Sequence, residues 1–337
     1  MNKKLSIFAI ILIIIGLVGT IWSGINTIPY FMNEISRVEQ ESMKEETIYN
    51  KDILNIKKVI VETKGCNVKI KRNNENKIRV NKIGNQDYAK YDFDNNNNTL
   101  TIKESYINKN NNFNNLDFKT LFDNLIESAF SVKNEEIIVY LPNNIDLEVI
   151  TNDGNLEVES GFESKNIVFK TLLGWISLPE EVKNIENLQI LSSSNISLGV
   201  MELLGIKNLN IGCNDLNIYS NDNYILIDNI ENYIPLNLNI VQYNSDDTSV
   251  NIESNIPIAK NLNIKGNNSV YLQIPIEKYK INFDVNVSEN IYLNNNIFIE
   301  NNISDNLKQI KGVLNKGLEN LNEQYNVTIK SDTLEIN

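Results

Sequence analysis

The chain has 337 residues, no histidine and a formal net charge of −12 at pH 7. The missing histidine excludes Ser-His-Asp and Cys-His catalysis, HExxH zinc sites and any histidine general base. The acidic balance argues against nucleic acid and anionic lipid surfaces as partners, because both carry negative charge. No Walker loop or GxGxxG motif occurs, so the sequence predicts no catalytic residues, no cofactor and no metal site.

Residues 1–30 predict a transmembrane anchor. Lys3 and Lys4 precede an uncharged, mostly aliphatic run from Leu5 to Trp22, and a helix continued to Tyr30 is long enough to cross a ~30 Å hydrocarbon core. A cleaved signal peptide and a buried core helix are the alternatives, but no A-x-A cleavage pattern follows this long run. Both lysines precede the run, so we expect a single-pass cell-membrane protein with a cytoplasmic N-terminus and an extracellular C-terminal domain.

The segment that follows combines a stalk with a β-rich part. Residues 31–50 are polar nearly all round and predict a helical stalk. Alternating apolar residues then predict strands between asparagine-rich turns, at residues 59–61, 68–70, 78–80 and 100–102. After a loop at 103–115, apolar residues at helical spacing predict a helical insertion near 116–130. Residues 51–135 therefore form a β-rich N-terminal part with one helix.

From residue 136 onward, pairs of apolar residues separated by one residue recur at a fixed period. One series of pairs starts every 20 residues, at Leu156, Ile176, Ile196 and Leu216. A second series starts every 21 residues, at Ile167, Leu188 and Leu209. Such a period is typical of repeats that share one continuous core. We therefore predict a mainly β protein, with a β-solenoid of ~20-residue coils and two short strands per coil over residues 136–303.

The alternation also predicts which side chains face outward. Residues between the paired apolar positions should point to solvent, because strand side chains alternate between faces. In the first series these are Glu157, Ser177, Ser197 and Asn217.

The C-terminal segment, residues 304–337, is predicted to cap the solenoid. Residues 304–323 fit a helix with Ser304 as its N-cap and one apolar face. A strand pair follows at residues 327–329 and 334–336. Because a solenoid needs capped ends, this segment should cover the last coil, with packing of the helix on a flank as the alternative.

Asparagine suits the corners of a solenoid, and the two cysteines suit its core. Asparagine accounts for 62 of the 337 residues; it tolerates left-handed backbone, favours turns and can form stacked side-chain ladders. Compositional bias explains most of the excess. Cys66 and Cys213 are expected to pack in the core as small hydrophobic residues, and a disulfide between them is the less favoured alternative.

Few residues qualify for chemistry. The acidic pairs Asp246–Asp247 and Glu180–Glu181 could serve a carboxylate-based, polysaccharide-active enzyme, but solvated corners are the favoured interpretation. Asp92, Asp94 and the Asn221–Asn223 segment are too sparse for a calcium loop.

Trp175 is an aromatic residue that could bind a ligand. It directly precedes the inward-facing Ile176, so it should face outward or lie at a corner. A role in ligand binding and a role in packing against a flanking helix are both open.

The segment from Ile137 to Val158 contains a strand ending in Leu141-Pro142, a second strand, and a turn with Gly154-Asn155 before the next strand. This pattern resembles the bacterial "putative adhesin" β-strand-repeat family, a domain of unknown function, over roughly residues 55–300. Asn155 stands where the family more often has aspartate, and later repeats lose the glycine. The resemblance implies a β-solenoid behind one membrane helix, often accompanying envelope-stress regulators, and it transfers no catalytic residues.

The predicted function is that of a non-enzymatic, membrane-anchored envelope protein, an adhesin-like module for adhesion or envelope-stress sensing. The alternatives are a carboxylate-based polysaccharide-active enzyme and a structural accessory subunit of a membrane complex. The expected partners are the membrane, through the anchor, and an envelope protein or glycan of unknown identity, with no nucleic acid.

Overall fold

The computed structural model describes residues 44–53, 55–84, 89–106, 135–220, 227–243, 248–293, 304–306, 308–315 and 324–337, together with Met32, Asn33 and Ser36. The chain divides into two units. One unit comprises Met1–Glu46, Ile83–Ala89 and Tyr106–Glu135 and is described at only a few positions. The other comprises Thr47–Lys82, Lys90–Ser105 and Glu136–Asn337 and holds nearly all of the described strands.

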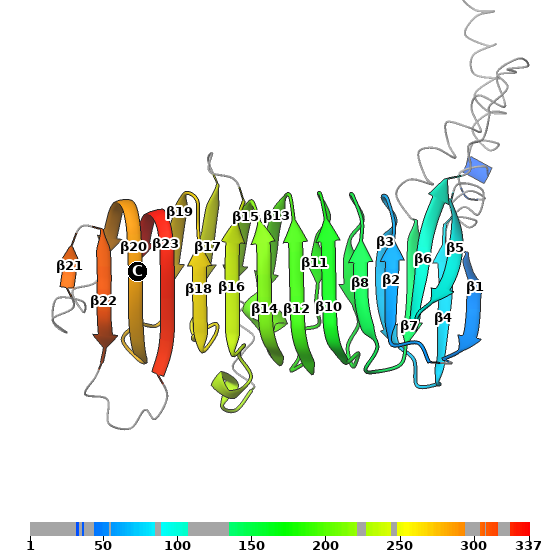
Figure 1. Ribbon diagram of the computed structural model, residues 1–337, viewed down its shortest axis with the longest axis horizontal. Coiled ribbons are helices and arrows are strands. Elements are labelled where there is room, and N and C mark those ends of the chain that lie inside the picture. The colour runs from blue at the N-terminus through cyan, green and yellow to red at the C-terminus, as the bar shows by residue number, and fades with distance from the viewer. Residues whose placement is uncertain are drawn as a thin grey trace, which may run out of the picture. The chain divides into compact units, whose positions relative to one another are not determined.

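This second unit is a stack of strands in two layers, in which strands stand side by side in a row (Figure 1). The first layer follows the spatial order β6 (Thr99–Tyr106), β2 (Lys58–Glu62), β8 (Asp146–Ile150), β10 (Ser164–Thr171), β12 (Ile185–Ser192), β14 (Ile206–Cys213), β16 (Asn237–Gln242) and β18 (Asn261–Lys265). It continues through the first part of β23 (Gln324–Ile336), β20 (Lys280–Leu293), β22 (Gln309–Leu314) and β21 (Ser304–Asn306).

The second layer holds the other strand of each coil. Its order is β1 (Glu45–Asp52), β4 (Lys77–Ile83), β7 (Glu136–Leu141), β3 (Asn67–Arg72), β9 (Leu156–Val158) and β11 (Ile176–Ser177). The row continues with β13 (Asn195–Gly199), β15 (Asp215–Tyr219), β17 (Ser249–Glu253) and β19 (Ser269–Gln273), then the second parts of β23 and β20. β5 (Ala89–Asn96) leads into β6 through a turn at Asn97–Asn98, both with left-handed backbone.

The repeat periods correspond to strand register. In the first layer Ile167 pairs with Leu188, which pairs with Leu209. In the second layer Leu156 pairs with Ile176, and Ile196 pairs with Leu216. These pairings are parallel, so the predicted solenoid of two strands per ~20-residue coil is confirmed for this part of the chain.

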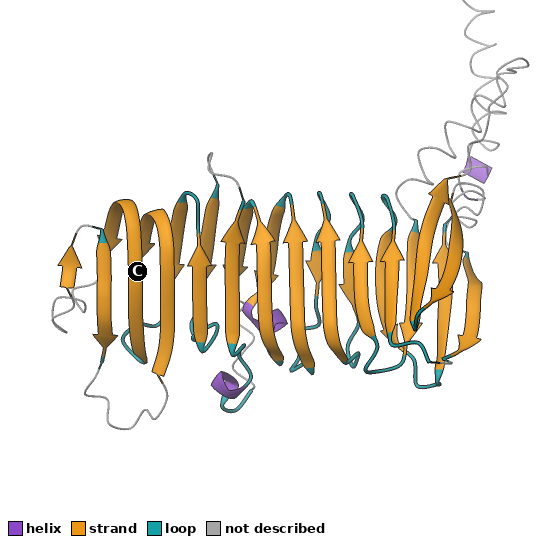
Figure 2. Ribbon diagram, viewed as in Figure 1, coloured by secondary structure: helices purple, strands orange, loops and turns teal. Residues whose placement is uncertain are grey.

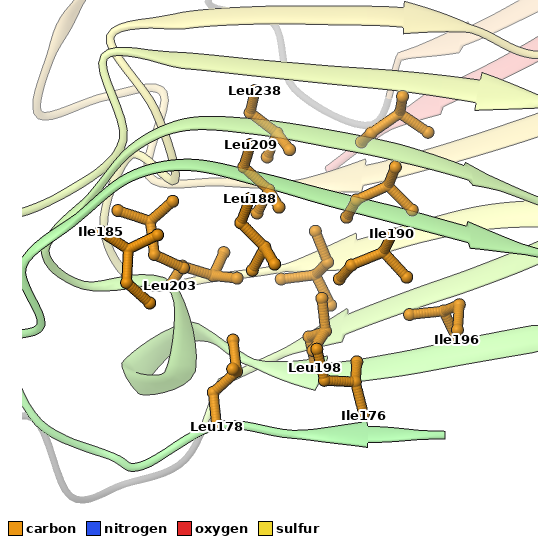
Figure 3. Close-up of a cluster of buried hydrophobic side chains, with 14 of the residues drawn as sticks. Ile176, Leu178, Ile185, Leu188, Ile190, Ile196, Leu198, Leu203, Leu209 and Leu238 are labelled. Carbon is orange, nitrogen blue, oxygen red and sulfur yellow. The ribbon is translucent and has the colours of Figure 1, made fainter. Parts of the chain in front are cut away.

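Apolar residues of the two layers face each other and form one core. Figure 3 shows Leu188, Leu209 and Leu238 following one another on adjacent strands, with Ile196 and Leu198 on the strand opposite. All five are at most 1% exposed. Among the largest fully buried side chains are Phe169 and Phe283, both on first-layer strands.

Corners join the strands, and two short 3₁₀ helices, η2 (Val200–Leu203) and η4 (Ile230–Asn232), lie in longer connections (Figure 2). The tightest corners require glycine. A Cβ atom on Gly174 would lie 2.0 Å from the carbonyl oxygen of Gly154, the equivalent corner residue of the preceding coil. Thr171 closes the same corner, because its Oγ1 accepts a 2.7 Å hydrogen bond from the Gly174 N–H.

Both ends of the stack depart from chain order. β2 and β3 lie between the β6–β7 coil and the β8–β9 coil, although they precede all four strands in the chain. Similarly, β23, the last strand of the chain, lies between β18–β19 and β20. Leu334 and Ile336 are therefore 0% exposed although the chain ends at Asn337. The stack also begins before residue 136, because β2, β3 and β6 are part of it.

The predicted C-terminal helix over residues 304–323 is wrong where the structure describes it. Residues 304–306 and 309–314 form β21 and β22, and β22 pairs antiparallel with β20. Ile310 and Leu314 are both buried, and a spacing of four residues places two side chains on one face of a strand as well as of a helix. The segment forms a strand because β20 would otherwise be an edge strand, with backbone N–H and C=O groups free to pair with β22.

Other helical predictions meet the structure only in part. The stalk over residues 31–50 is wrong from Glu45 onward, where β1 begins and Tyr49 stacks on Phe93 with ring centroids 4.7 Å apart. Strand β6 extends into the predicted 103–115 loop as far as Tyr106. The anchor at 1–30 and the insertion at 116–130 lie outside the described residues, and no helix within the described part is long and apolar enough to cross a membrane.

Replacing Ile329 with alanine should destabilise the second unit by about 2–5 kcal/mol, the cost of a cavity in a packed core. Ile329 is 1% exposed on β23, which is held between two other coils. Urea unfolding followed by circular dichroism measures the change. The neighbouring Lys330 is exposed, and Lys330→Ala should stay within about 0.5 kcal/mol of wild type. Equal effects of the two variants would contradict the placement of β23.

Candidate interaction surface

The acidic residues considered for catalysis do not form a reactive pair in the described part of the chain. Glu181 serves a corner: its carboxylate accepts hydrogen bonds from Ser160 Oγ at 2.6 Å and from the Gly161 N–H at 2.8 Å. These bonds lower the pKa of Glu181, and Glu180 beside it is exposed. Asp246–Asp247 lie outside the described residues.

The structure also offers no cluster for a metal ion among the residues it describes. No group of three or more His, Cys, Asp or Glu side chains comes together there. Asp92 and Asp94 lie on β5, and Asn221–Asn223 are outside the described residues.

A buried lysine occupies the corner between β11 and β12. Lys183 is 7% exposed, and its Nζ donates to the carbonyl oxygens of Pro179 at 2.6 Å and Glu181 at 2.8 Å. Burial lowers the pKa of Lys183 to about 8, against the opposing effect of the Glu202, Glu181 and Glu180 carboxylates. The carbonyl oxygens surround the ammonium group, so this lysine has a structural role at the corner.

Both cysteines are buried and neither is in a disulfide, as predicted. Cys213 lies on β14, and burial, together with the charge of Asp215, raises the pKa of its thiol to about 12. Cys66 accepts a hydrogen bond from Tyr91 Oη at 3.1 Å. The raised pKa keeps the Cys213 thiol neutral, and a neutral thiol is a poor nucleophile.

The outward side of the first layer carries a ladder of asparagine side chains, which we call the asparagine ladder. The Nδ2 of each member after the first donates to the Oδ1 of the asparagine on the preceding strand of the stack, at 2.7–3.3 Å. From β10 to β20 its members are Asn166, Asn187, Asn208, Asn237, Asn261, Asn326 and Asn282. All are partly buried, so their amide groups are satisfied by one another along the stack.

A shorter second ladder runs beside it. Asn239 donates to Asn210 at 2.8 Å, and Asn263 donates to Asn239 at 2.9 Å. An amide group has two N–H donors and two oxygen lone pairs, so a ladder with one bond in each direction uses half of this capacity. The two ladders thus form an uncharged, polar strip that is ordered by its own hydrogen bonds.

Toward β2 the same layer carries charge instead of amides. Glu148 on β8 accepts hydrogen bonds from Lys58 on β2 and from Lys170 on β10, each at 2.6 Å. Burial raises the pKa of Glu148, but the two lysine hydrogen bonds outweigh this effect and the pKa is lowered. The ion pairs link three adjacent strands as the asparagines do elsewhere.

Trp175 lies at a corner of the second layer and is 51% exposed. Leu172 and Leu173 of the same corner are 50% and 67% exposed. The preceding coil has the same Thr-x-x-Gly corner with Asn152 and Asp153 at the two middle positions. The corner geometry therefore does not need apolar side chains.

The matching family model covers residues 56–331, most of the chain, and describes the Toastrack domain DUF4097. The chain belongs to this family. The predicted adhesin-like β-repeat family of unknown function is thereby confirmed. The search of curated proteins found no match to this Toastrack chain.

Solved structures similar to this Toastrack protein include two bacterial ones. One is a "putative adhesin" from Bacteroides fragilis NCTC 9343, with 11% sequence identity, a TM-score of 0.45, and coverage of 88% of this chain and 99% of the other. The second is a "putative cell adhesion protein" from Clostridium sporogenes ATCC 15579, with 12% identity, a TM-score of 0.22, and coverage of 87% and 97%.

The asparagine content of the sequence indicates that stacked ladders can form but does not place one, although a signal for its position exists. The four residues Asn-Leu-Asn-Ile occur three times, beginning at Asn208, Asn237 and Asn261. The step from the first to the second is 29 residues, because the connection with η4 lengthens that coil. The Toastrack repeat is therefore regular in space where its sequence period is broken.

Replacing Asn208 with alanine should cost about 1–3 kcal/mol, because the partly buried amides of Asn187 and Asn237 each lose a partner. Denaturant unfolding of the full chain measures this. Asn217→Ala on the second layer is the control, since Asn217 is exposed and should change stability by less than about 0.5 kcal/mol. A neutral Asn208→Ala would show that the ladder does not stabilise the stack.

Lys183 should give the protein a stability that rises with pH. Its pKa is about 8 in the folded state and ~10.4 when unfolded. Between these values the unfolded state binds more protons, so stability increases as pH rises from about 8 to 10.5, by roughly 2–3 kcal/mol. The comparison of wild type with Lys183→Met isolates this term, and Lys207→Met at an exposed lysine is the control. If the free energy of unfolding changed with pH in the same way for wild type and Lys183→Met, the lowered pKa of Lys183 would be contradicted.

Proposed function

We propose that this Toastrack protein is a non-enzymatic, adhesin-like module that residues 1–30 hold at the outer face of the cell membrane. The observation that carries the proposal is the regular pair of outward faces, in which strands repeat in register over many coils and present polar side chains at equivalent positions. Such surfaces suit contact with an extended partner, because the same groups recur at a fixed step.

The arrangement of the carboxylates supports a binding role over catalysis. The candidate Glu181 is already engaged with a neighbouring corner, and Glu148 is held ionised by two lysines. A glycosidase needs a pair of carboxyl groups flanking one bond, one of them protonated. Neither of these two carboxylates is placed as such a pair.

The location is tested with intact cells that produce the full chain. We expect the protein in the membrane fraction, and we expect protease added outside the cells to degrade it. A chain lacking residues 1–30 should leave the membrane fraction and resist external protease. Protection of the full chain until the cells are lysed would overturn the proposed orientation.

The non-enzymatic role is tested with the purified full chain. Incubation with neutral and acidic polysaccharides should release no reducing ends. Turnover that is lost in Glu181→Gln but retained in Glu186→Gln, which alters a glutamate of the neighbouring strand β12, would establish carboxylate chemistry and overturn the proposal.

A further inference from the structure

In the described part of the second layer from β11 to β20, four aromatic side chains are exposed or half-buried. Trp175 directly precedes β11, Tyr219 ends β15, Tyr271 lies on β19 and Tyr292 lies on β20. Trp175, Tyr219 and Tyr292 are 51%, 37% and 53% exposed, and Tyr271 is half-buried. We call these four residues the aromatic row.

The row has a regular spacing. The strands follow one another in the order β11, β13, β15, β17, β19, β23 and β20, so an aromatic residue occurs on every second strand. Strands in a sheet are ~4.8 Å apart, which places successive members roughly 10 Å apart along the stack. Tyr271 and Tyr292 lie in one column, since both pair with Glu335 of β23. Tyr219 is offset from this column by two residues along its strand. Trp175, which is equivalent to Asp215 in the 20-residue series, is offset by two residues in the opposite direction.

The strands between the aromatic residues present small polar groups. Ser197 on β13 and Asn251 on β17 are exposed. On β23, Glu335 lies between Tyr271 and Tyr292, because it pairs with both. The Tyr271 hydroxyl donates to Gln273 and accepts from Asn337, at 3.1 and 2.8 Å, so its ring is held in place. Two acidic residues lie on these intervening strands, Glu335 on β23 and Glu253 on β17, and Glu253 pairs with Gln273 of β19.

We propose that the aromatic row binds an extended, uncharged polysaccharide strand that runs along the stack. The flat faces of sugar rings carry C–H groups that pack on aromatic rings, while their hydroxyls suit amide and hydroxyl partners. An aromatic residue at every second strand matches a β-linked hexose chain, in which alternate rings present the same face. The acidic neighbours disfavour uronic acids and other anionic glycans. This inference rests on the proposed role as an adhesin-like module and names its ligand.

The test uses the full chain purified in detergent, with chito-oligosaccharides and cello-oligosaccharides of two to six sugars as probes in calorimetry. Affinity should rise with length as the chain reaches a second and then a third aromatic residue. Polygalacturonate should not bind. Equal affinity at all lengths, preference for the anionic polymer, or failure of every neutral probe to bind would each overturn the inference.

Variants locate the binding surface. Tyr292→Ala and Trp175→Ala should each weaken binding of the hexasaccharide by at least about tenfold. Tyr292→Phe should restore binding, because it keeps the ring. The control is Tyr233→Ala, since this tyrosine is 40% exposed but lies beside η4 and not on the second layer. Loss of binding in the control alone would place the ligand elsewhere.

The two proposals fail in different experiments. External protease tests where the protein lies, and calorimetry tests what the aromatic row binds. A surface-exposed protein without glycan affinity would overturn only the ligand, whereas glycan binding by a chain that is protected inside the cell would overturn only the proposed location.

Discussion

The structure depends on parallel stacking of paired apolar residues in register. A single coil has two short strands and cannot bury its own inward side chains, so each coil is stable only between neighbours. Burying one large aliphatic side chain contributes about 1.5–3 kcal/mol. Leu188, Leu209 and Leu238 occupy equivalent positions on adjacent strands, and each is buried by the next. The same register places every outward residue above its equivalent in the preceding coil.

Stacking imposes strict demands where the chain turns. Coils approach so closely at Gly174 that any side chain would collide with the backbone of the preceding corner. At other corners polar side chains satisfy the backbone: Lys183 donates to carbonyl oxygens, and Glu202 accepts from the backbone N–H groups of Leu178 and Gly199. Burial raises the pKa of Glu202, partly offset by these two hydrogen bonds. Corners are thus stabilised by polar contacts at the positions where apolar stacking ends.

Much of this stack follows from sequence periodicity, and the departures have physical causes. The pairs starting at Leu156, Ile176, Ile196 and Leu216 define strand, face and register together, because a period of two residues and a period of 20 are both needed. The helix expected at 304–323 fails because the spacing of Ile310 and Leu314 also fits a strand, and pairing with β20 is a tertiary contact that local pattern does not contain. The insertion of β2–β3 and of β23 one coil inward is equally non-local. The Asn-Leu-Asn-Ile repeat does contain the asparagine ladder, although its changing period hides it.

In a repeat protein, outward side chains that differ from their equivalents carry the functional information. The asparagine ladder repeats the same residue on successive strands, and its bonds run between coils, so cohesion of the stack accounts for it. The second layer is different, because aromatic side chains occur among its polar outward residues at every second strand from β11 to β20. The corner at Leu172, Leu173 and Trp175 keeps the threonine and glycine of the preceding corner while replacing its polar residues. The preceding corner makes the same hydrogen bond without apolar side chains, and we therefore assign these exposed side chains to ligand binding.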